Sequence, residues 1–219
     1  MPIIPECTMS MNTWSAPLTA LTFAVLDFET TGLHPERGDQ ICEIGLVKLH
    51  VGEKRIVHEL SELVNPQRSI PHSAYQVHGI TDDMVRDKPT LDKILPKLLT
   101  RLSGSVVAVY NAPFEFSFLY RALRKAGLPH LRGLGIDVLE LARQMRCSDY
   151  GYKLETVARA LQIPPIQTHR ALADAELTAR ILYVLIQQLL NRQLNTLMHL
   201  YRRFGERVVF NLSSPPPRT

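Results

Sequence analysis

A short apolar run that ends in two acids constrains this sequence more than any other stretch. Residues 23–26 (Phe-Ala-Val-Leu) have the composition of a buried strand, and Asp27 and Glu29 follow directly. Side chains two residues apart on a strand point to the same face, so the two carboxylates would project together. Such a pair repels unless a cation lies between the two groups, and divalent metals bind oxygen ligands. The alternative is an ordinary strand end with solvated acids. Gly32, just beyond, lets the chain turn sharply and a ligand approach the backbone.

Charge is distributed unevenly along the 219 residues. Residues 192–218 hold five arginines against one acid, Glu206, and this excess equals the net charge of +4 of the whole chain. A basic end on a neutral body indicates a polyanionic partner, and the alternative is a solvated tail. We therefore expect a flexible N-terminal extension over 1–19, one folded domain over 20–190 and a basic C-terminal extension over 191–219.

The cysteines and the start of the chain indicate where the protein works. Cys7, Cys42 and Cys147 are far apart and odd in number, which indicates neither a disulfide framework nor a metal cluster. The chain does not begin with a basic region and a long apolar stretch, so we expect no secretory signal. No apolar run reaches the length that spans a bilayer. These features predict a cytoplasmic protein without a membrane partner.

The pattern of apolar residues predicts an α/β fold with a mixed sheet. The three-residue connection at 52–54 predicts an antiparallel hairpin, and the fully apolar run at 106–110 predicts a buried parallel strand. Strands are expected at 21–28, 41–51, 55–64, 106–110 and 135–138, with a small extra strand at 208–210. Helices are expected at 91–102, 114–126, 139–145, 154–161 and 171–190, and we expect the last helix to continue toward Leu200.

Glu115 is the first acid that could join the pair on the strand. It follows the strand at 106–110 and the helix-starting residues Asn111 and Pro113. Ligands of α/β sheets gather at the carboxyl ends of the strands, so Glu115 would lie near Asp27 and Glu29. The alternative is a first-turn acid that only favours the helix dipole.

His169 and Asp174 form the next candidate group. Pro164 and Pro165 prevent an early helix start, and the apolar period begins at Ala171. His169 is therefore expected on the loop before the helix, where it can gain or lose a proton near neutral pH, with Asp174 in the first turns and directed back at the site. The alternatives are a solvated loop histidine and a solvated helix acid. A further histidine, His78, lies just before a glycine and either lines a pocket or belongs to a turn beside the core.

Taken together, four carboxylates from three separate elements and one histidine predict a two-metal hydrolase site. Two Mg²⁺ or Mn²⁺ ions, roughly 4 Å apart, would clamp the attacking and leaving oxygens of a phosphodiester. Asp27 would bridge the two ions, and His169 would take the proton of the attacking water as general base. The catalytic and metal-binding set is Asp27, Glu29, Glu115, His169 and Asp174.

These residues occur in motifs that resemble the DEDDh exonucleases of the DEDD superfamily. Residues 27–32 (Asp-Phe-Glu-Thr-Thr-Gly) match the first family motif, and residues 169–175 match the third, His-x-Ala-x-x-Asp-Ala, in full. Residues 110–115 match the second, usually His-Asn-Ala-x-Phe-Asp, except that Tyr110 replaces the histidine and Glu115 the aspartate. The segments 77–81 and 137–143 are also similar to family segments. The resemblance covers about residues 21–190, and the chain is similar to bacterial DNA polymerase III proofreading (epsilon) subunits.

The resemblance implies the fold, the reaction and the substrate contacts. The fold would be an RNase H-like mixed sheet of five strands, with strand two antiparallel to the rest, flanked by helices. The reaction would be 3′–5′ hydrolysis of nucleic acid ends, preferably single-stranded DNA or RNA, with release of nucleoside 5′-monophosphates. A polymerase partner follows by the same likeness. The residues assigned to substrate binding are Thr30, Thr31, Gly32, His78, Asn111 and Phe114.

Three functions remain open from the sequence. The first is a DNA exonuclease in proofreading or repair, and the second is an RNA 3′-end trimming exoribonuclease. The third is a non-catalytic nucleic-acid-binding or polymerase-associated module, which the longer Glu115 side chain favours because it could displace a metal ligand. The intact motif at 169–175 favours activity.

Overall fold

A computed structural model describes residues 12–164 and 169–213 of the chain. A single mixed sheet forms its centre, in the strand order β3-β2-β1-β4-β5-β6. The strands are β1 (Thr22–Thr30), β2 (Ile41–His50), β3 (Arg55–Leu63), β4 (Val106–Val109), β5 (Leu134–Asp137) and β6 (Val209–Asn211). β2 is antiparallel to β1, and β4 and β5 are parallel to it.

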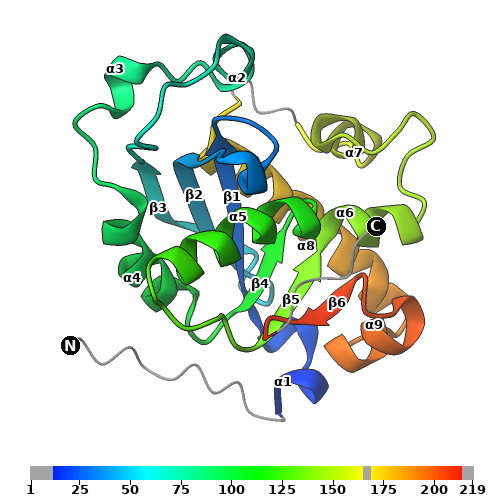
Figure 1. Ribbon diagram of the computed structural model, residues 1–219. Coiled ribbons are helices and arrows are strands. Elements are labelled where there is room, and N and C mark those ends of the chain that lie inside the picture. The colour runs from blue at the N-terminus through cyan, green and yellow to red at the C-terminus, as the bar shows by residue number, and fades with distance from the viewer. Residues whose placement is uncertain (1–11, 165–168, 214–219) are drawn as a thin grey trace.

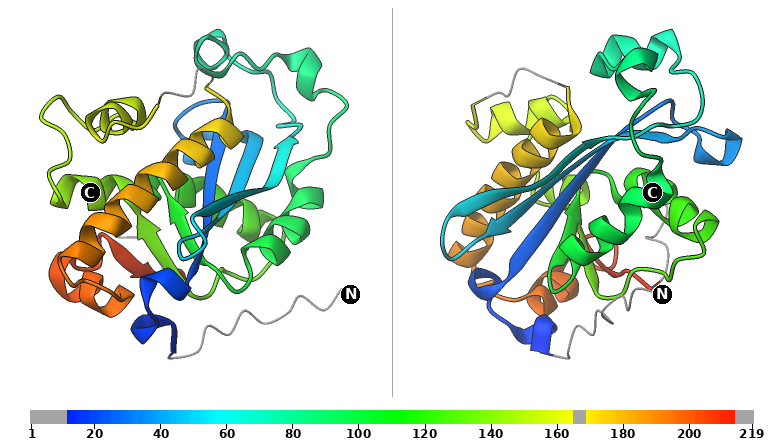
Figure 2. Two further views of the ribbon diagram at one scale, coloured as in Figure 1. Left: turned by 180° about the vertical axis from the view of Figure 1, so that it is seen from behind. Right: turned by 90° about the vertical axis from the view of Figure 1, so that its left-hand side faces the viewer.

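Helices cover both faces of this sheet (Figures 1 and 2). One face packs against α4 (Leu91–Leu102) and α5 (Ala112–Lys125). The other packs against α6 (Val138–Gln144), α7 (Leu154–Ala160), α8 (Ala171–Asn191) and α9 (Leu197–Phe204). The short elements are α1 (Asn12–Ser15), η1 (Leu18–Ala20), η2 (Pro35–Arg37), α2 (His72–His78) and α3 (Asp82–Val85). The α/β, RNase H-like prediction is confirmed, and the small extra strand expected at 208–210 joins the same sheet as β6.

The small strand expected at 208–210 forms as β6, and its place in the sheet corrects the five-stranded count that the family resemblance implies. β6 pairs antiparallel with β5, and Ile136 lies opposite Val209. The pairing places the C-terminal segment at the edge of the same sheet.

Helix α8 ends at Asn191, so the prediction that it continues toward Leu200 is wrong. Gln193 takes a positive φ of 61°, and the Leu194 N–H donates to the Leu189 carbonyl at 3.0 Å. This six-to-one hydrogen bond is typical of a Schellman helix end. A new helix, α9, follows after Thr196, whose hydroxyl accepts the His199 N–H. The leucines of this region keep a helical spacing because they form the buried face of a second helix.

The described parts of the two predicted extensions pack on each other at the end of the sheet where β1 begins. Trp14 meets Tyr201 edge to face at 5.5 Å between ring centroids. The Leu18 N–H donates to the Asn195 carbonyl at 2.7 Å, and the Leu18 side chain is fully buried. The flexibility expected of residues 1–11, and the arginine and prolines of residues 214–219, lie outside the described residues. The predicted region boundaries stay predictions.

Successive side chains of β1 point to opposite faces of the sheet, and both faces are buried, as in a central strand. Phe23 and Val25 enter the core under α8, whereas Leu26 and Phe28 enter the core under α4 and α5. Among the described residues, no helix combines the length and apolar character needed to cross a membrane.

Candidate active site

The two acids of β1 lie inside the strand and not at its tip. β2 pairs with β1 as far as Thr30, whereas β4 pairs with it only as far as Leu26. Asp27 and Glu29 continue the side of the strand that carries Val25, so both face α8. Beyond Leu26, one edge of β1 has no neighbouring strand within the described residues, which leaves room for other groups to approach the acids.

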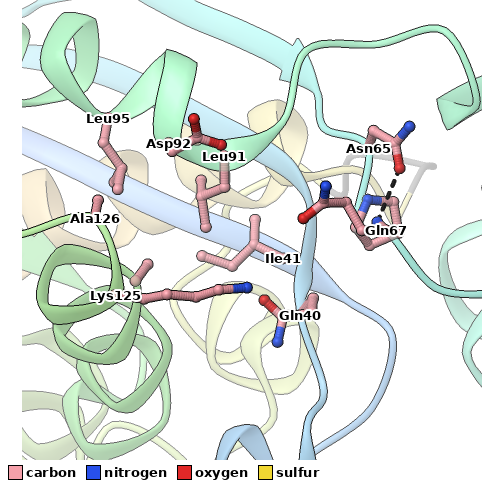
Figure 3. Close-up of a pocket in the computed structure, with 11 residues that line it drawn as sticks. Gln40, Ile41, Asn65, Gln67, Leu91, Asp92, Leu95, Lys125 and Ala126 are labelled. Carbon is pink, nitrogen blue, oxygen red and sulfur yellow. Dashed lines mark hydrogen bonds between the residues drawn. The ribbon is translucent and has the colours of Figure 1, made fainter.

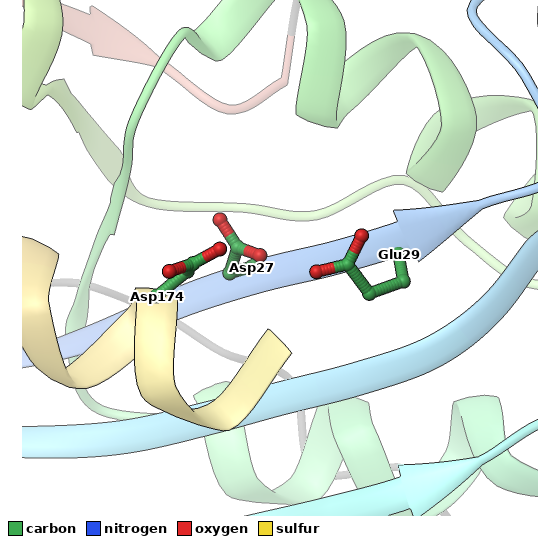
Figure 4. Close-up of side chains that lie close together, drawn as sticks. All are labelled: Asp27, Glu29 and Asp174. Atoms are coloured by element: carbon green, nitrogen blue, oxygen red, sulfur yellow. The ribbon is translucent and has the colours of Figure 1, made fainter. Parts of the chain in front are cut away.

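Asp174 reaches these two acids from the first turn of α8 (Figure 4). One carboxylate oxygen from each of Asp27, Glu29 and Asp174 lies within 4.8 Å of the other two. The helix begins at Ala171, as the sequence predicts, because Arg170 before it is extended with a φ of −143°. Three acids from two elements therefore meet at one point.

Glu115 approaches from the opposite face of the sheet. It lies in the first turn of α5 and is only 4% exposed. Its carboxylate accepts the backbone N–H of Phe28 at the unpaired edge of β1. Its second oxygen, Oε2, is buried without a hydrogen-bond partner among the described residues. The structure thus places Glu115 beside the three-acid cluster but outside it.

Burial and mutual repulsion raise the pKa of every acid in the site. Burial, followed by the neighbouring carboxylates, raises the pKa of Asp27 and of Glu115 well above the usual range. Burial, with repulsion from Asp174 and Glu43, raises the pKa of Glu29 to about 8. Burial also raises the pKa of Asp174 to about 6. A cation bound among these acids would stabilise their ionised form. A buried carboxylate oxygen without a hydrogen-bond partner is suited to act as a metal ligand.

His169 lies on the loop before α8, as predicted. Its Nδ1 atom is 3.5 Å from the Glu155 carboxylate on α7, and its side chain is 57% exposed. A carboxylate at Nδ1 leaves the other ring nitrogen, Nε2, available for proton transfer. Glu155 could not be predicted from the sequence. A prolyl break separates its segment from that of His169, and no periodic pattern connects the two.

The residues assigned to substrate binding differ in their access to solvent. Thr31 is 1% exposed, and its hydroxyl accepts the Gln40 N–H at 3.1 Å. A side chain at Gly32 would meet the Asp39 carboxylate at 2.3 Å, so this glycine makes room for the loop that follows. The Thr30 hydroxyl donates to the Gly32 carbonyl at 2.7 Å. These three residues hold the end of β1 in shape.

The other assigned residues lie around the same edge. His78 is 6% exposed, and its Nδ1 accepts the Ile80 N–H at 3.0 Å while the ring also bonds the Thr30 backbone. Asn111 takes a left-handed conformation with a φ of 77° before α5. Phe114 is half-buried, and its ring lies 5.2 Å from that of Phe118 between centroids. Phe114 and Asn111 therefore have access to a ligand, whereas the His78 ring is engaged within the protein.

Three buried or partly buried acids that support the site were missed by sequence reasoning. Glu43 on β2 is 2% exposed and bonds Arg170 and Ala171. Asp137 at the end of β5 accepts the first N–H groups of two helices, from Ala112 and Glu140. Asp39 accepts the His34 N–H. For Glu43 the available signal was an acid inside an apolar strand, since such an acid needs a partner.

A pocket elsewhere does not compete with this site. It has a cavity volume of about 350 Å³ and lies between the start of β2, α4 and α5 (Figure 3). Among the residues that line it, Asp92 is the only acid. A single acid in a lining that also holds amide side chains and Lys125 forms no carboxylate cluster, so the three-acid cluster is the candidate active site.

Comparison with known sequences identifies the family. The family model described as "Exonuclease" matches residues 24–182. A PolC-type DNA polymerase III of Thermotoga petrophila is 40% identical over 161 residues, which cover 73% of this chain and 11% of the polymerase. The chain belongs to the exonuclease family. The 3'-5' exonuclease DinG of Bacillus subtilis is 33% identical over 193 residues, which cover 87% of this chain and 20% of that protein. The chain thus spans between a tenth and a fifth of the length of these curated relatives.

Solved structures agree with this membership. Exonuclease X in complex with 5' overhanging duplex DNA is 28% identical, with a TM-score of 0.61, and the match covers 76% of this chain and 92% of that one. The nuclease domain of 3'hExo, a DEDDh family member bound to rAMP, has a TM-score of 0.67 at 19% identity and covers 79% of this chain and 95% of that one. The second match supports the fold alone. Membership of the exonuclease family confirms the prediction of an exonuclease, a phosphodiester hydrolase, and the DEDDh-like motifs of the sequence all lie within the matched residues.

Proposed function

We propose that this chain removes nucleotides from DNA 3′ ends, preferably single-stranded, in a reaction that depends on two divalent cations, Mg²⁺ or Mn²⁺. The observation that carries the proposal is the convergence of Asp27, Glu29 and Asp174 within 4.8 Å, from β1 and α8. Their raised pKa values fit a site built for cations, as does the Glu115 oxygen that has no hydrogen-bond partner among the described residues. When bound, such ions activate a water molecule and neutralise charge on the leaving 3′ oxygen.

The chain's own residues would divide the remaining work. Asp27, Glu29, Glu115 and Asp174 would hold the cations. His169 would accept the proton of the attacking water at Nε2, while Glu155 orients the ring through Nδ1. Phe114 and Asn111 would contact the terminal nucleotide, and the backbone of residues 30–32 would shape the edge beside it. The product would be a nucleoside 5′-monophosphate.

DNA is the proposed substrate because of the relatives. A DNA polymerase III and a 3'-5' exonuclease are among the similar proteins, and Exonuclease X was solved with DNA. The polymerase relatives also support a role in proofreading or repair, with a polymerase partner, in the cytoplasm. The nuclease domain of 3'hExo was solved with rAMP bound, so RNA trimming is the second candidate for the assay.

The basic C-terminal segment lies far from this site. Arg192 follows the last residue of α8, and Arg202 and Arg203 lie in the last turn of α9. The acids lie at the first turn of α8, whose 21 residues extend about 30 Å at roughly 1.5 Å per residue. The views of Figures 1 and 2 agree that α9 lies beside the end of α8 that is remote from its first turn. These arginines would therefore bind phosphates remote from the cleaved bond.

The test is the activity of the wild type on 5′-labelled single strands of DNA and RNA with one sequence. With Mg²⁺ or Mn²⁺ we expect stepwise shortening of the DNA strand and free mononucleotides, and with a chelator we expect none. His169→Ala should lower the rate by about 10²–10⁴-fold. Mn²⁺ binding should be retained in this variant, because the carboxylates are untouched.

Two other results would change the proposal. A faster reaction on RNA would favour the trimming function. A wild type that binds both strands but cleaves neither, with Mn²⁺ present, would replace the enzyme by a non-catalytic nucleic-acid-binding module.

A further inference from the structure

A buried acid on the neighbouring strand connects the two parts of the proposed site. Glu43 lies on β2 directly opposite Glu29 of β1 and is 2% exposed. The sequence motifs of the family resemblance do not include it. A carboxylate at such a position is costly unless it is paired and hydrogen-bonded.

The partners of Glu43 all lie at the start of α8. The Arg170 Nε donates to the two Glu43 oxygens at 2.9 and 3.1 Å, and Arg170 Nη2 donates to Oε1. The backbone N–H of Ala171 donates to Oε2 at 3.0 Å. A planar guanidinium held by two nitrogens has its direction fixed as well as its distance. The carboxylate therefore joins β2 to both the side chain and the backbone of this segment.

A glycine two residues along β2 shows how close this contact is. Gly45 lies on the same face as Glu43 and opposite Asp27. A Cβ atom added at Gly45 would lie 2.1 Å from the carbonyl carbon of Ala171. The helix start thus rests on the strand backbone itself, and any side chain at residue 45 would displace it.

The residues next to this contact are the ones that the proposed reaction needs. His169 precedes Arg170 directly, and the Asp174 N–H donates to the Arg170 carbonyl at 3.0 Å. A shift of Arg170 would therefore move Asp174 relative to the acids of β1. A misplacement of about 1 Å can slow a reaction about 10²-fold.

We propose that Glu43 is a positioning residue that, through Arg170 and the Ala171 N–H, holds Asp174 and His169 in register with Asp27 and Glu29. This role rests on the proposed function of the same site. The competing explanation is an ion pair that stabilises the fold without affecting the site.

The test compares Glu43→Gln with Glu59→Gln. Glu43→Gln keeps the volume of the side chain and removes the charge that holds the guanidinium. Glu59 is the matched control, because it is also a strand acid paired with an arginine, Arg101, at 2.7 Å, with a side chain that is 15% exposed. It lies on β3 and its partner lies on α4, away from the carboxylates.

Three measurements are made on each protein: Mn²⁺ affinity by calorimetry, kcat and KM on a DNA strand, and Tm. For Glu43→Gln we expect Mn²⁺ affinity and kcat each to fall by about 10–100-fold, which is typical when a residue that orients metal ligands is changed. KM should change less than about threefold. Glu59→Gln should lower Tm only. Equal and small effects of the two substitutions on Mn²⁺ affinity would overturn the proposal.

Arg170→Lys keeps the experiment decisive if Glu43→Gln does not fold. Lysine keeps the charge but loses the two-nitrogen fork, so an intermediate loss of Mn²⁺ affinity is expected and an unchanged affinity would contradict the role. A wild type without nuclease activity would defeat the proposed function. The Mn²⁺ titrations would still decide the positioning role, because they need no turnover.

Discussion

The two helices that bring acids to the site begin in different ways. Both have the first N–H bound by a buried carboxylate from a strand: Ala171 of α8 by Glu43, and Ala112 of α5 by Asp137. At α8 a guanidinium also pairs with the carboxylate, and the helix rests directly on Gly45. At α5 the carboxylate has backbone N–H partners, and burial raises its pKa.

This difference matches the positions of the acids that follow. Asp174, on the doubly held helix, lies in the three-acid cluster, whereas Glu115 lies outside it with one oxygen unpartnered among the described residues. An ion pair and close packing together fix the start of α8, and they thereby fix the position of Asp174. We infer that the α8 side of the site is fixed by the fold and that the α5 side is adjustable.

The largest expected effect is on the fixed side. Asp174→Asn should lower kcat/KM by about 10³-fold or more, because a metal contributes several kcal/mol and each 1.36 kcal/mol is about tenfold. Rates are measured on a DNA strand with Mn²⁺. Glu176→Gln is the control, since Glu176 lies on the same helix but pairs with His58 and Arg180. A loss below tenfold for Asp174→Asn would break the distinction between the two sides.

A smaller effect is expected on the adjustable side. Glu115→Asp should lower kcat by no more than about fivefold, far below the 10²-fold that a misplacement of about 1 Å can cost at a rigid site. The shorter side chain keeps the charge but withdraws from the Phe28 N–H. The measurement is kcat over a range of Mn²⁺ concentrations. A large increase would instead show that the longer acid impairs this enzyme, and a loss as severe as that of Asp174→Asn would make the sides equivalent.

The smallest expected effect is on the pH dependence of the free energy of unfolding when no metal is bound. Burial and repulsion raise the pKa of Glu29 to about 8, while an unfolded glutamate titrates near roughly 4.3. Between these values the folded state keeps a proton that the unfolded state has lost, so the free energy of unfolding falls as pH rises. Glu29→Gln, which has no charge to bury, should escape this loss.

The measurement is Tm in chelator across pH 4 to 8. The variant should exceed the wild type by about 3 °C or more near pH 8, given 2–4 °C per kcal/mol for a chain of this size, and the gap should close toward pH 4. A Tm difference between variant and wild type that stays constant with pH would show that Glu29 ionises normally. It would then contradict the raised pKa of Glu29 on the fixed side of the site.

The sequence predicted the parts of this site that depend on local patterns. The spacing of Asp27 and Glu29 on a strand gave their shared face, and Pro164 with Ala171 gave the start of α8 and the place of His169. The support of these residues could not be predicted in the same way. Glu43 and Arg170 are 127 positions apart, and only the folded sheet brings them together.

Where local patterns were misread, a backbone detail decided the outcome. The leucines after α8 continue its helical spacing, but the positive φ of Gln193 ends that helix, and a second helix follows. The small strand expected at 208–210 does form, as β6, but its place as the sixth strand of the sheet follows only from its pairing with β5. This second detail depends on a neighbour that lies far away in the chain.

The length of α8 separates opposite charges across the molecule. Acids gather around its first turn and arginines follow its end, in the sense that the helix dipole favours. Negative charge therefore gathers at one end of α8 and positive charge at the other. The two groups lie about 30 Å apart, at roughly 1.5 Å per residue. Under the proposed function, a strand long enough to reach the arginines would gain an attraction that a short oligonucleotide at the acids lacks. Strand length itself would then be a determinant of affinity, and the benefit should fade as salt screens the distant arginines.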